Sequence, residues 1–450
     1  MGSLGQILIA DPDKKAGEAR AKGLEAAGYR AQACDDPDQF LAQAAAIEPD
    51  VVLIGPFGGK RDALNLAQSL KAEAATSHIP IMVYGDDMAA MRRDAPAVGI
   101  DDILPRTAEA AEITARLPRL VRSSVMQTEL ARRVITAAEF GHAVDPAEFT
   151  RNYPQRPRIL AVCENGARLS DLQQALLLDG FHAIPERSAF RAGERIDDER
   201  VDAAVIGIEG AGDIDRGASL TKHIRTNPRL FNLPTLLIGD AIDEAARTRL
   251  YEAGASIVSC EPIRSDARTQ ISAYLHMLVA RQRLRWTLRD PFKAVLAPAT
   301  GDPGLRGVYS TDFLMAHLHR LLTARAAHGN DLSIAVLRID NAPGVREEHG
   351  EEAVRILMQQ MADWITGMSR IEDCVARMPG DGFALVMPDT PAVEAERVIH
   401  RIAGILHQSE FHLTEEVMEV VHVWPSVAAI AAEDGESAED LLARAEAARR

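Results

Sequence analysis

The stretch Pro49-Asp-Val-Val-Leu-Ile-Gly55 places four apolar residues in a row between an aspartate and a glycine. A short, unbroken apolar run that is rich in β-branched residues is typical of a strand buried on both faces of a sheet. Similar runs stand at residues 7–10 and 81–84, and amphipathic segments at 18–27 and 63–74 lie between the runs. Strands that alternate with helices in this way predict a parallel sheet with helices on both faces.

The whole pattern occurs twice in the chain. It starts again at Arg158-Ile-Leu-Ala-Val162, and Val201-Asp-Ala-Ala-Val-Ile-Gly207 repeats the opening stretch about 150 residues further on. A third apolar run, Thr235-Leu-Leu-Ile238, continues the repeat, which ends near Gln282. We therefore predict an α/β protein with two doubly wound, flavodoxin-like domains related by internal duplication.

From Leu332 onward the order of the elements changes. Strand, helix, a pair of strands, helix, strand and a final helix predict an α+β domain, with elements at 333–339, 352–365, 375–387, 393–406, 417–424 and 438–448. A long helix is expected at 108–141, and prolines at 291, 298 and 303 indicate a linker. The predicted segments are a first doubly wound domain over 1–125, a helical linker over 126–156, a second doubly wound domain over 157–285, a linker over 286–304 and the α+β domain over 305–450.

Bulk composition narrows the classes of function. The chain has 450 residues, 47% of them hydrophobic, which is enough for about three cores. Its formal net charge of −16 disfavours nucleic-acid binding, because no cationic surplus is available to the phosphates. The sequence has no run of 18 apolar residues and no basic-then-apolar amino terminus, so we expect a cytoplasmic protein without a membrane span. Four scattered cysteines without Cys-x-x-Cys spacing predict reduced thiols and no metal site.

The two doubly wound copies resemble receiver domains of two-component response regulators. In that family an aspartate at the end of the third strand accepts a phosphoryl group, and acidic residues after the first strand hold Mg²⁺. Here Gly55 and Gly207 stand at the acceptor positions, and only Asp11 and Glu164 remain of the acidic pairs. The phosphate-sensing hydroxyl is replaced by Gly85 and Gly239, and the partner lysine by Arg106 and Glu261. Phosphoryl transfer needs a nucleophile and a metal clamp together, so we predict two pseudo-receivers that serve docking or dimerisation. Asp50 stays open as an alternative acceptor, although its place at the start of an apolar strand directs it away from the site.

The last domain resembles a diguanylate cyclase domain, whose signature reads Gly-Gly-Asp/Glu-Glu-Phe (GGDEF). The matching stretch is Arg377-Met-Pro-Gly-Asp-Gly-Phe383, in which Pro379 replaces a glycine and Gly382 removes a carboxylate. The strand end that binds metal in the family reads Arg338-Ile-Asp-Asn-Ala-Pro-Gly-Val-Arg346 here, with Arg338 at the first metal position. A positive charge about 4 Å from Mg²⁺ costs about 2 kcal/mol even in water. We therefore predict a degenerate domain that is not an enzyme and holds no catalytic metal.

Upstream of this loop, Ser369-Arg-Ile-Glu-Asp373 contains the pattern Arg370-x-x-Asp373. At this offset the cyclase family has an Arg-x-x-Asp that binds the product, cyclic di-GMP, and Arg401 aligns with a further arginine of that site. A guanidinium can pair with guanine O6 and N7, and a carboxylate can accept hydrogen bonds from guanine N1 and N2. Arg397, one helical turn before Arg401, could share the role. The alternative is a surface ion pair worth a few tenths of a kcal/mol, and Arg195-Ile-Asp-Asp198 fits the same short pattern.

The order receiver, receiver, cyclase resembles PleD-type response regulators. Lost cyclase residues beside a retained ligand motif resemble the PopA type of cyclic di-GMP effector, although the glycines at both acceptor positions depart from that type. The resemblance implies a regulatory ligand and no cofactor, protein recruitment in cell-cycle control at the cell pole, and a proteolytic adaptor of the RcdA kind as partner. Stacked ligand molecules can bridge two surfaces, so a homodimer and a contact from Arg187 are further expectations. Two alternatives remain: a diguanylate cyclase with weak activity, and a scaffold that needs no ligand.

Overall fold

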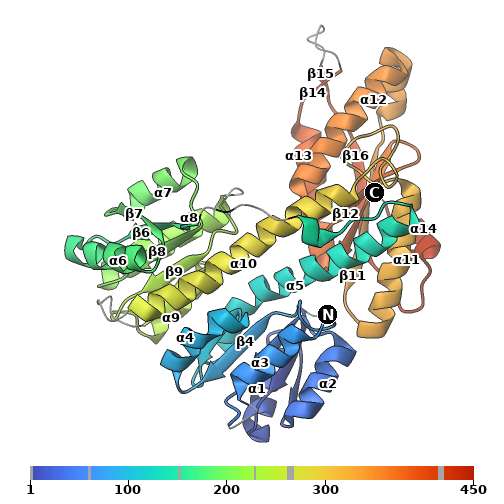
Figure 1. The fold of residues 1–450 in the computed structure, drawn as a ribbon. Helices are drawn as coiled ribbons and strands as arrows, with labels where there is room; N and C mark the ends of the chain where they lie inside the picture. The colour runs from blue at the N-terminus through green and yellow to red at the C-terminus, as the bar shows by residue number, and fades with distance from the viewer. Residues whose placement is uncertain are drawn as a thin grey trace. The chain divides into compact units, whose positions relative to one another are not determined.

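The computed structural model describes residues 4–58, 62–149, 153, 155–227, 230–260, 268–413 and 420–449. Internal contacts divide the chain into two units. One holds residues 6–124 and 151–286, and the other holds residues 125–150 and 287–450 with the first five residues. Two of the boundaries between the units, at 124/125 and 286/287, fall inside long helices, α5 (Ala110–Glu139) and α10 (Arg268–Val295) (Figure 1). Helix α5 corresponds to the helix predicted at 108–141.

The first receiver-like domain is built on a five-stranded parallel sheet in the order β2-β1-β3-β4-β5. Its strands are β1 (Gln6–Ala10), β2 (Arg30–Cys34), β3 (Val51–Ile54), β4 (Ile81–Gly85) and β5 (Asp102–Pro105). Between them lie α1 (Lys14–Ala26), α2 (Pro37–Ile47), α3 (Ala63–Ala72) and α4 (Met88–Val98), which α5 follows. Each of these four helices begins at an aspartate whose carboxylate accepts from backbone N–H groups of the first turn: Asp13, Asp36, Asp62 and Asp87. Most acids that follow a strand therefore serve to start a helix.

The second receiver-like domain repeats this strand order, as β7-β6-β8-β9-β10. Its strands are β6 (Arg158–Val162), β7 (His182–Glu186), β8 (Ala203–Gly207), β9 (Thr235–Ile238) and β10 (Ile257–Ser259). Its helices are α6 (Gly166–Leu178), α7 (Ala189–Asp198), α8 (Ala211–Thr226), α9 (Glu244–Glu252) and α10. All residues of β3 and of β8 are buried, as the apolar runs predicted.

The duplication extends to single hydrogen bonds. The Asp50 carboxylate accepts from the backbone N–H of Gln6 at 2.8 Å, and the Asp202 carboxylate accepts from that of Arg158 at 2.7 Å. Both aspartates immediately precede the third strand of their sheet. Asp50 therefore lies at the opposite end of β3 from Gly55, which removes it as an alternative phosphoryl acceptor.

The C-terminal domain is α+β, so the predicted fold class is confirmed for all three parts. Its antiparallel sheet has the order β12-β13-β11-β16. The elements are α11 (Thr311–His328), β11 (Leu332–Ile339), α12 (Ala342–Met368), β12 (Cys374–Met378), β13 (Gly382–Pro388), α13 (Ala392–Gln408), β14 (Phe411–His412), β15 (Val420–Val421), β16 (Pro425–Ala431) and α14 (Ala438–Ala447) (Figure 1). Within the described ranges, no helix combines the length and apolar character needed to cross a bilayer.

One strand of this sheet was predicted in the wrong place. Residues 417–419 of the strand expected at 417–424 lie outside the described residues, and 420–421 form only a short hairpin strand with β14. The fourth strand of the sheet is β16, which pairs with β11 over its whole length. Its alanine-rich sequence has little strand propensity of its own, so pairing with β11 decides its conformation.

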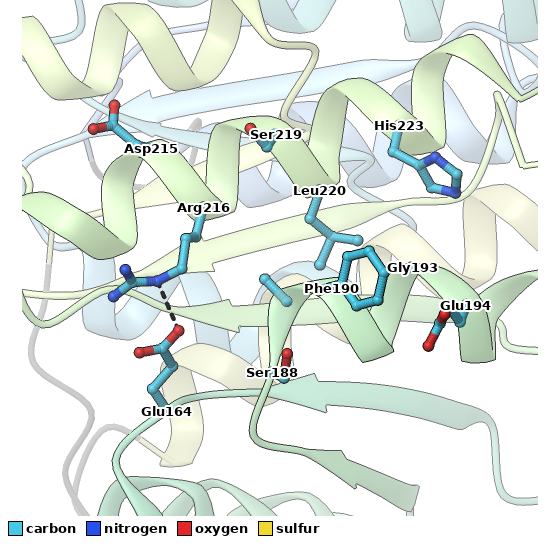
Figure 2. Close-up of a pocket in the computed structure, with 11 residues that line it drawn as sticks. Glu164, Ser188, Phe190, Gly193, Glu194, Asp215, Arg216, Ser219, Leu220 and His223 are labelled. Carbon is cyan, nitrogen blue, oxygen red and sulfur yellow. Dashed lines mark ion pairs between the residues drawn. The ribbon is translucent and has the colours of Figure 1, made fainter.

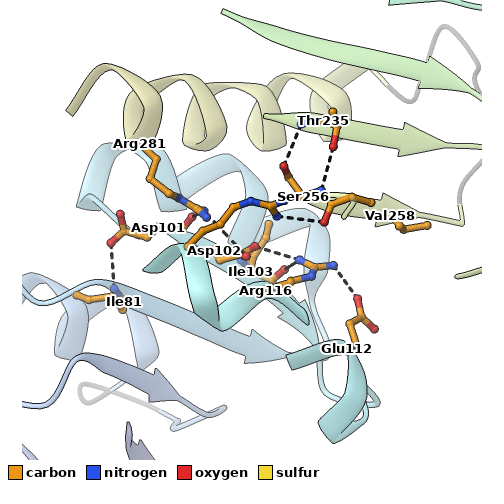
Figure 3. A network of polar contacts seen from close by, with 12 residues as sticks. Ile81, Asp101, Asp102, Ile103, Glu112, Arg116, Thr235, Ser256, Val258 and Arg281 are labelled. Carbon is orange, nitrogen blue, oxygen red and sulfur yellow. Dashed lines mark hydrogen bonds and ion pairs between the residues drawn. The ribbon is translucent and has the colours of Figure 1, made fainter. Parts of the chain in front are cut away.

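A buried arginine joins the two receiver-like domains within their unit. Arg116 of α5 is 2% exposed, and its guanidinium pairs with Glu112 at 2.6 Å and with Asp102 at 3.0 Å (Figure 3). Its Nε also donates to the Tyr251 hydroxyl of the second domain at 3.0 Å. Arg281 of α10 lies on the other side of Asp102, at 4.0 Å. Two acids are thus buried only because arginines neutralise them.

We expect Arg116→Met to lower the free energy of unfolding by about 3–5 kcal/mol, because it leaves Asp102 and Glu112 buried without their main cation. Thermal and urea unfolding followed by circular dichroism measure this loss. Arg191→Met, at an exposed arginine of α7, is the control and should change stability by less than about 0.5 kcal/mol. Equal effects of the two substitutions would contradict this interpretation.

Candidate functional site

The predicted ligand motif forms a closed turn between α12 and β12, and we call residues 370–373 the ligand turn. The Asp373 N–H donates to the Arg370 carbonyl at 3.1 Å, and the Asp373 carboxylate accepts from the Arg370 N–H at 2.7 Å. The Arg370 side chain is exposed, whereas Asp373 is only 7% exposed. The turn thus carries an exposed arginine side chain and a largely buried carboxylate that is anchored to the backbone.

The carboxyl group of Asp373 has a higher pKa than an ordinary aspartate. Burial raises its pKa to about 7, and the neighbouring Glu372 carboxylate contributes to the rise. The hydrogen bond from the Arg370 N–H and the charges of Arg370 and Arg133 act in the opposite direction without offsetting burial. Near neutral pH the group is therefore present in both protonation states.

The two other predicted ligand arginines lie on α13. Arg397 and Arg401 are one helical turn apart and exposed, and neither guanidinium pairs with another side chain of the described residues. Arg370 and Asp373 are brought together in one turn. In the described part of the chain, no hydrogen bond or ion pair joins that turn to Arg397 or Arg401.

Arg338 covers the signature loop from the neighbouring strand. It lies opposite Gly382 in the β11–β13 ladder, and its guanidinium donates to the Gly380 carbonyl at 3.2 Å and pairs with Glu446 at 3.1 Å. A Cβ atom at position 382 would lie 3.0 Å from the Arg338 Cγ and 2.9 Å from the Leu337 carbonyl oxygen. The Arg338 side chain therefore occupies the space that a side chain at position 382 would need, so the arginine at 338 and the glycine at 382 depend on each other.

The carboxylates that remain near the signature loop bind arginines. Asp381 accepts from Arg346 with both oxygens, at 2.8 and 2.9 Å, and Asp340 accepts from Arg449 at 3.1 Å and from the Ser426 hydroxyl at 2.8 Å. A divalent cation would have to displace these partners and tolerate Arg338 nearby. Among the described residues, no group of three or more His, Cys, Asp or Glu is arranged to hold a metal ion. The side chains present do not fit the metal ions of a cyclase.

In the first receiver-like domain, a tyrosine fills the phosphoryl-acceptor site. A Cβ atom at Gly55 would lie 2.9 Å from the Tyr84 hydroxyl oxygen and 3.0 Å from the Ala10 carbonyl oxygen. That hydroxyl donates to the buried Asp11 carboxylate at 2.6 Å, and the Arg20 guanidinium lies 4.1 Å from the centre of the Tyr84 ring. Burial, and then the Asp11 carboxylate, raise the pKa of Tyr84 well above its usual value, so the phenol stays protonated as a donor. Asp11 is thus bound to a phenol where the family holds Mg²⁺.

In the second receiver-like domain, the acidic residues near the acceptor position form ion pairs with arginines. Arg216 pairs with Glu164 at 2.7 Å and with Asp213 at 2.7 Å, and Arg168 pairs with Glu209 at 3.2 Å. These residues follow β6 and β8, at the end of the sheet where Gly207 stands at the acceptor position. Again the donor set does not fit a divalent cation. Glu261, predicted at the lysine position, lies outside the described residues.

The same domain has a pocket of about 530 Å³ between α7 and α8. Phe190 and Leu220 contribute apolar surface, and the Glu164–Arg216 ion pair lies at its margin (Figure 2). Phe190 is 76% exposed. Arg187, expected as a ligand contact, is not among the lining residues; its guanidinium donates to the Glu164 carbonyl at 3.3 Å.

Several site residues were not predicted from the sequence. Tyr84, Arg216 and Arg449 act by filling or neutralising a site that they reach from another element. Tyr84 could have been noticed, because it directly precedes Gly85 at the end of β4. Arg346 ends the quoted strand-end stretch, but nothing in the sequence indicated that it pairs with Asp381.

The raised pKa of Asp373 predicts a pH dependence of stability. The unfolded carboxyl has a pKa near 3.9, so between about pH 4 and pH 7 the folded chain retains a proton that the unfolded chain has lost. Stability should therefore fall as the pH rises through this window. Asp373→Asn, whose amide oxygen can still accept from the Arg370 N–H, should flatten the decline. Thermal unfolding of both proteins from pH 4.5 to 8 measures it, and parallel curves would contradict the raised pKa.

Comparisons with known proteins agree with this architecture. Residues 304–450 match the family model described as "Diguanylate cyclase, GGDEF domain". The chain is 24% identical over 446 residues to the response regulator PleD of Caulobacter vibrioides, covering 98% of this chain and 95% of that protein. It is 26% identical over 156 residues to the diguanylate cyclase DgcP of Pseudomonas aeruginosa, covering 35% of this chain and 22% of that protein.

Among solved structures, the GGDEF domain of DgcB from Caulobacter crescentus, in complex with c-di-GMP, is 21% identical with a TM-score of 0.32 and covers 33% of this chain and 84% of that chain. The likeness to PleD runs through both doubly wound domains and the GGDEF domain. The chain is therefore similar to the response regulator PleD over nearly its whole length, and its carboxy-terminal domain matches the GGDEF family model.

Proposed function

We propose that this chain is a cyclic di-GMP-binding effector and that its GGDEF domain no longer makes the ligand. The observation that carries the proposal is a contrast within one domain. Arg370 presents an exposed side chain in the turn that its backbone N–H closes with Asp373, while the carboxylates near the signature loop are bound to arginines. The domain thus has side chains that can recognise cyclic di-GMP, the product of the cyclase reaction, but not side chains suited to its metal-dependent synthesis.

The ligand turn has the donor and acceptor that a guanine requires. A guanidinium can donate in a fork to O6 and N7, and a carboxylate can accept from N1–H and N2–H. These guanine donors would favour the ionised form of Asp373, so ligand binding would lower its raised pKa. Arg397 and Arg401 have unpaired guanidinium groups within the described part of α13, and they are available to neutralise the ligand phosphates.

The absence of cyclase chemistry follows from charge. Cyclisation of GTP relies on divalent ions to position the 3′-hydroxyl and to neutralise the triphosphate. Arg346 and Arg449 already neutralise Asp381 and Asp340, and the Arg338 side chain lies against Gly380, part of the loop that a nucleotide would approach. The same arginines would have to leave before metal could enter.

Two receiver-like domains without a phosphoryl acceptor suit an output other than phosphotransfer. By its resemblance to the PopA type, we assign the chain to recruitment of protein partners in response to cyclic di-GMP. A proteolytic adaptor of the RcdA kind, a cytoplasmic location at the cell pole and a homodimer belong to the same proposal. Co-localisation with such an adaptor in cells with and without the messenger would test this part.

Calorimetric titration with cyclic di-GMP tests the proposal directly. The parent chain should bind, and Arg370→Ala should weaken binding about 100-fold or more, because it removes the forked contact to guanine or phosphate. Arg355→Ala, at an exposed arginine that pairs with Glu352 in the same domain, is the matched control and should bind like the parent. An unchanged affinity of Arg370→Ala, or no binding by the parent, would refute the ligand site.

The second candidate function is a diguanylate cyclase of low activity. The match of residues 304–450 to the cyclase family model and the retained Asp381 favour it. Incubation with GTP and Mg²⁺ or Mn²⁺, followed by chromatography, separates the two candidates. We expect no cyclic di-GMP above a protein-free blank, since no described carboxylate near the loop lacks a cationic partner. Turnover that disappears in Asp381→Asn would instead establish the cyclase.

A further inference from the structure

The backbone of the ligand turn is held from the inside by an arginine distant in sequence. Arg133, in the part of α5 that belongs to the same unit, donates to the carbonyl oxygens of Glu372 and, at 3.3 Å, of Ile371. The arginine is 2% exposed. One planar side chain therefore binds the two central peptide groups of the turn whose ends carry Arg370 and Asp373.

Arg133 is itself fixed on several sides. Its Nε pairs with the fully buried Glu129 at 2.6 Å, and the same carboxylate oxygen lies 2.8 Å from Nε2 of the fully buried His317 on α11. The rings of Phe292 and Tyr309 lie 5.0 and 5.6 Å from its guanidinium carbon. The guanidinium thus has little freedom to turn away from the two carbonyl oxygens.

We propose that Arg133 is a positioning residue for the cyclic di-GMP site, an inference that rests on the function proposed above. Arg133 is internal and would not touch the ligand. By fixing the peptides of Ile371 and Glu372, it fixes the direction in which Arg370 and Asp373 leave the turn. A guanidinium suits this role because its rigid fork can serve two carbonyls and one carboxylate together, which a lysine ammonium cannot do with the same geometry.

The position of the Arg133 contact also connects the ligand turn to helices α5 and α10. Arg133 and Glu129 lie on α5 and Phe292 lies on α10, the two helices in which the chain passes from one compact unit to the other. The ligand turn therefore shares its internal support with the ends of both connecting helices. Ligand that orders the turn would stabilise the packing of these helix ends on the C-terminal domain, and loosening that packing would weaken ligand binding by the same factor.

Arg133→Lys tests the inference, and Arg116→Lys is a matched control. Both arginines lie on α5, are 2% exposed and pair at 2.6 Å with a buried glutamate four residues earlier, but Arg116 lies in the other unit. Both variants should lower the thermal midpoint. Titration with cyclic di-GMP should show about tenfold weaker binding, or 1.4 kcal/mol, for Arg133→Lys only. Hydrogen exchange of the ligand-free turn should also quicken only in this variant.

The outcomes separate the inference from the proposed function. If the parent binds the ligand and Arg133→Lys binds within about twofold of it, Arg133 has no positioning role. If the parent does not bind, the proposed function fails, and unchanged exchange of the ligand-free turn then overturns the positioning role as well. Should Arg133→Lys not fold, Glu129→Gln keeps a hydrogen-bond acceptor for Arg133 and removes only its charge. That variant should show a smaller loss of affinity, and parent-like affinity would count against the inference.

Discussion

Carboxylates that could hold a divalent cation are bound to hydrogen-bond donors of the protein itself, and this constraint underlies the other features of the structure. In the first receiver-like domain the donor is the phenol of Tyr84, and in the second it is the guanidinium of Arg216. In the GGDEF domain Arg346 and Arg449 play the same part. An arginine that pairs with a carboxylate removes both the negative charge and the coordination sites that a metal would use. In all three domains, protein donors thus occupy carboxylate oxygens that a divalent cation would need.

The GGDEF domain uses arginines in two opposite ways. At the signature loop the arginines form internal ion pairs, whereas Arg370 at the ligand turn is exposed. The difference comes from what surrounds each acid. Asp381 lies within reach of Arg346, but Asp373 is held by a backbone N–H group, which leaves the Arg370 guanidinium available. The exposed arginine of the turn and the internal ion pairs of the signature loop therefore rely on separate sets of contacts.

The fold was largely predictable, because buried parallel strands can be recognised in a sequence as short apolar runs between helices. The repeated Pro49–Gly55 stretch located both receiver-like sheets, and both third strands are buried throughout. Strand β16 was not predicted, because the conformation of its alanines is decided by pairing with β11 and not by local preference. The site was harder to predict, since a motif shows which residues are present but not what they touch. The burial of Asp373 and the hydrogen bond from Arg133 to the Ile371 carbonyl, across 238 residues of sequence, depend on tertiary packing alone.

The contact between Tyr84 and the acceptor position limits which side chain residue 55 can carry. A side chain at residue 55 would meet the Tyr84 hydroxyl oxygen, which is itself engaged by a buried acid. A single mutation that restored aspartate would therefore bring steric conflict and a second negative charge beside Asp11 before it brought any function. An acceptor carboxylate at residue 55 would therefore need at least one further substitution, at Tyr84, to make room for it.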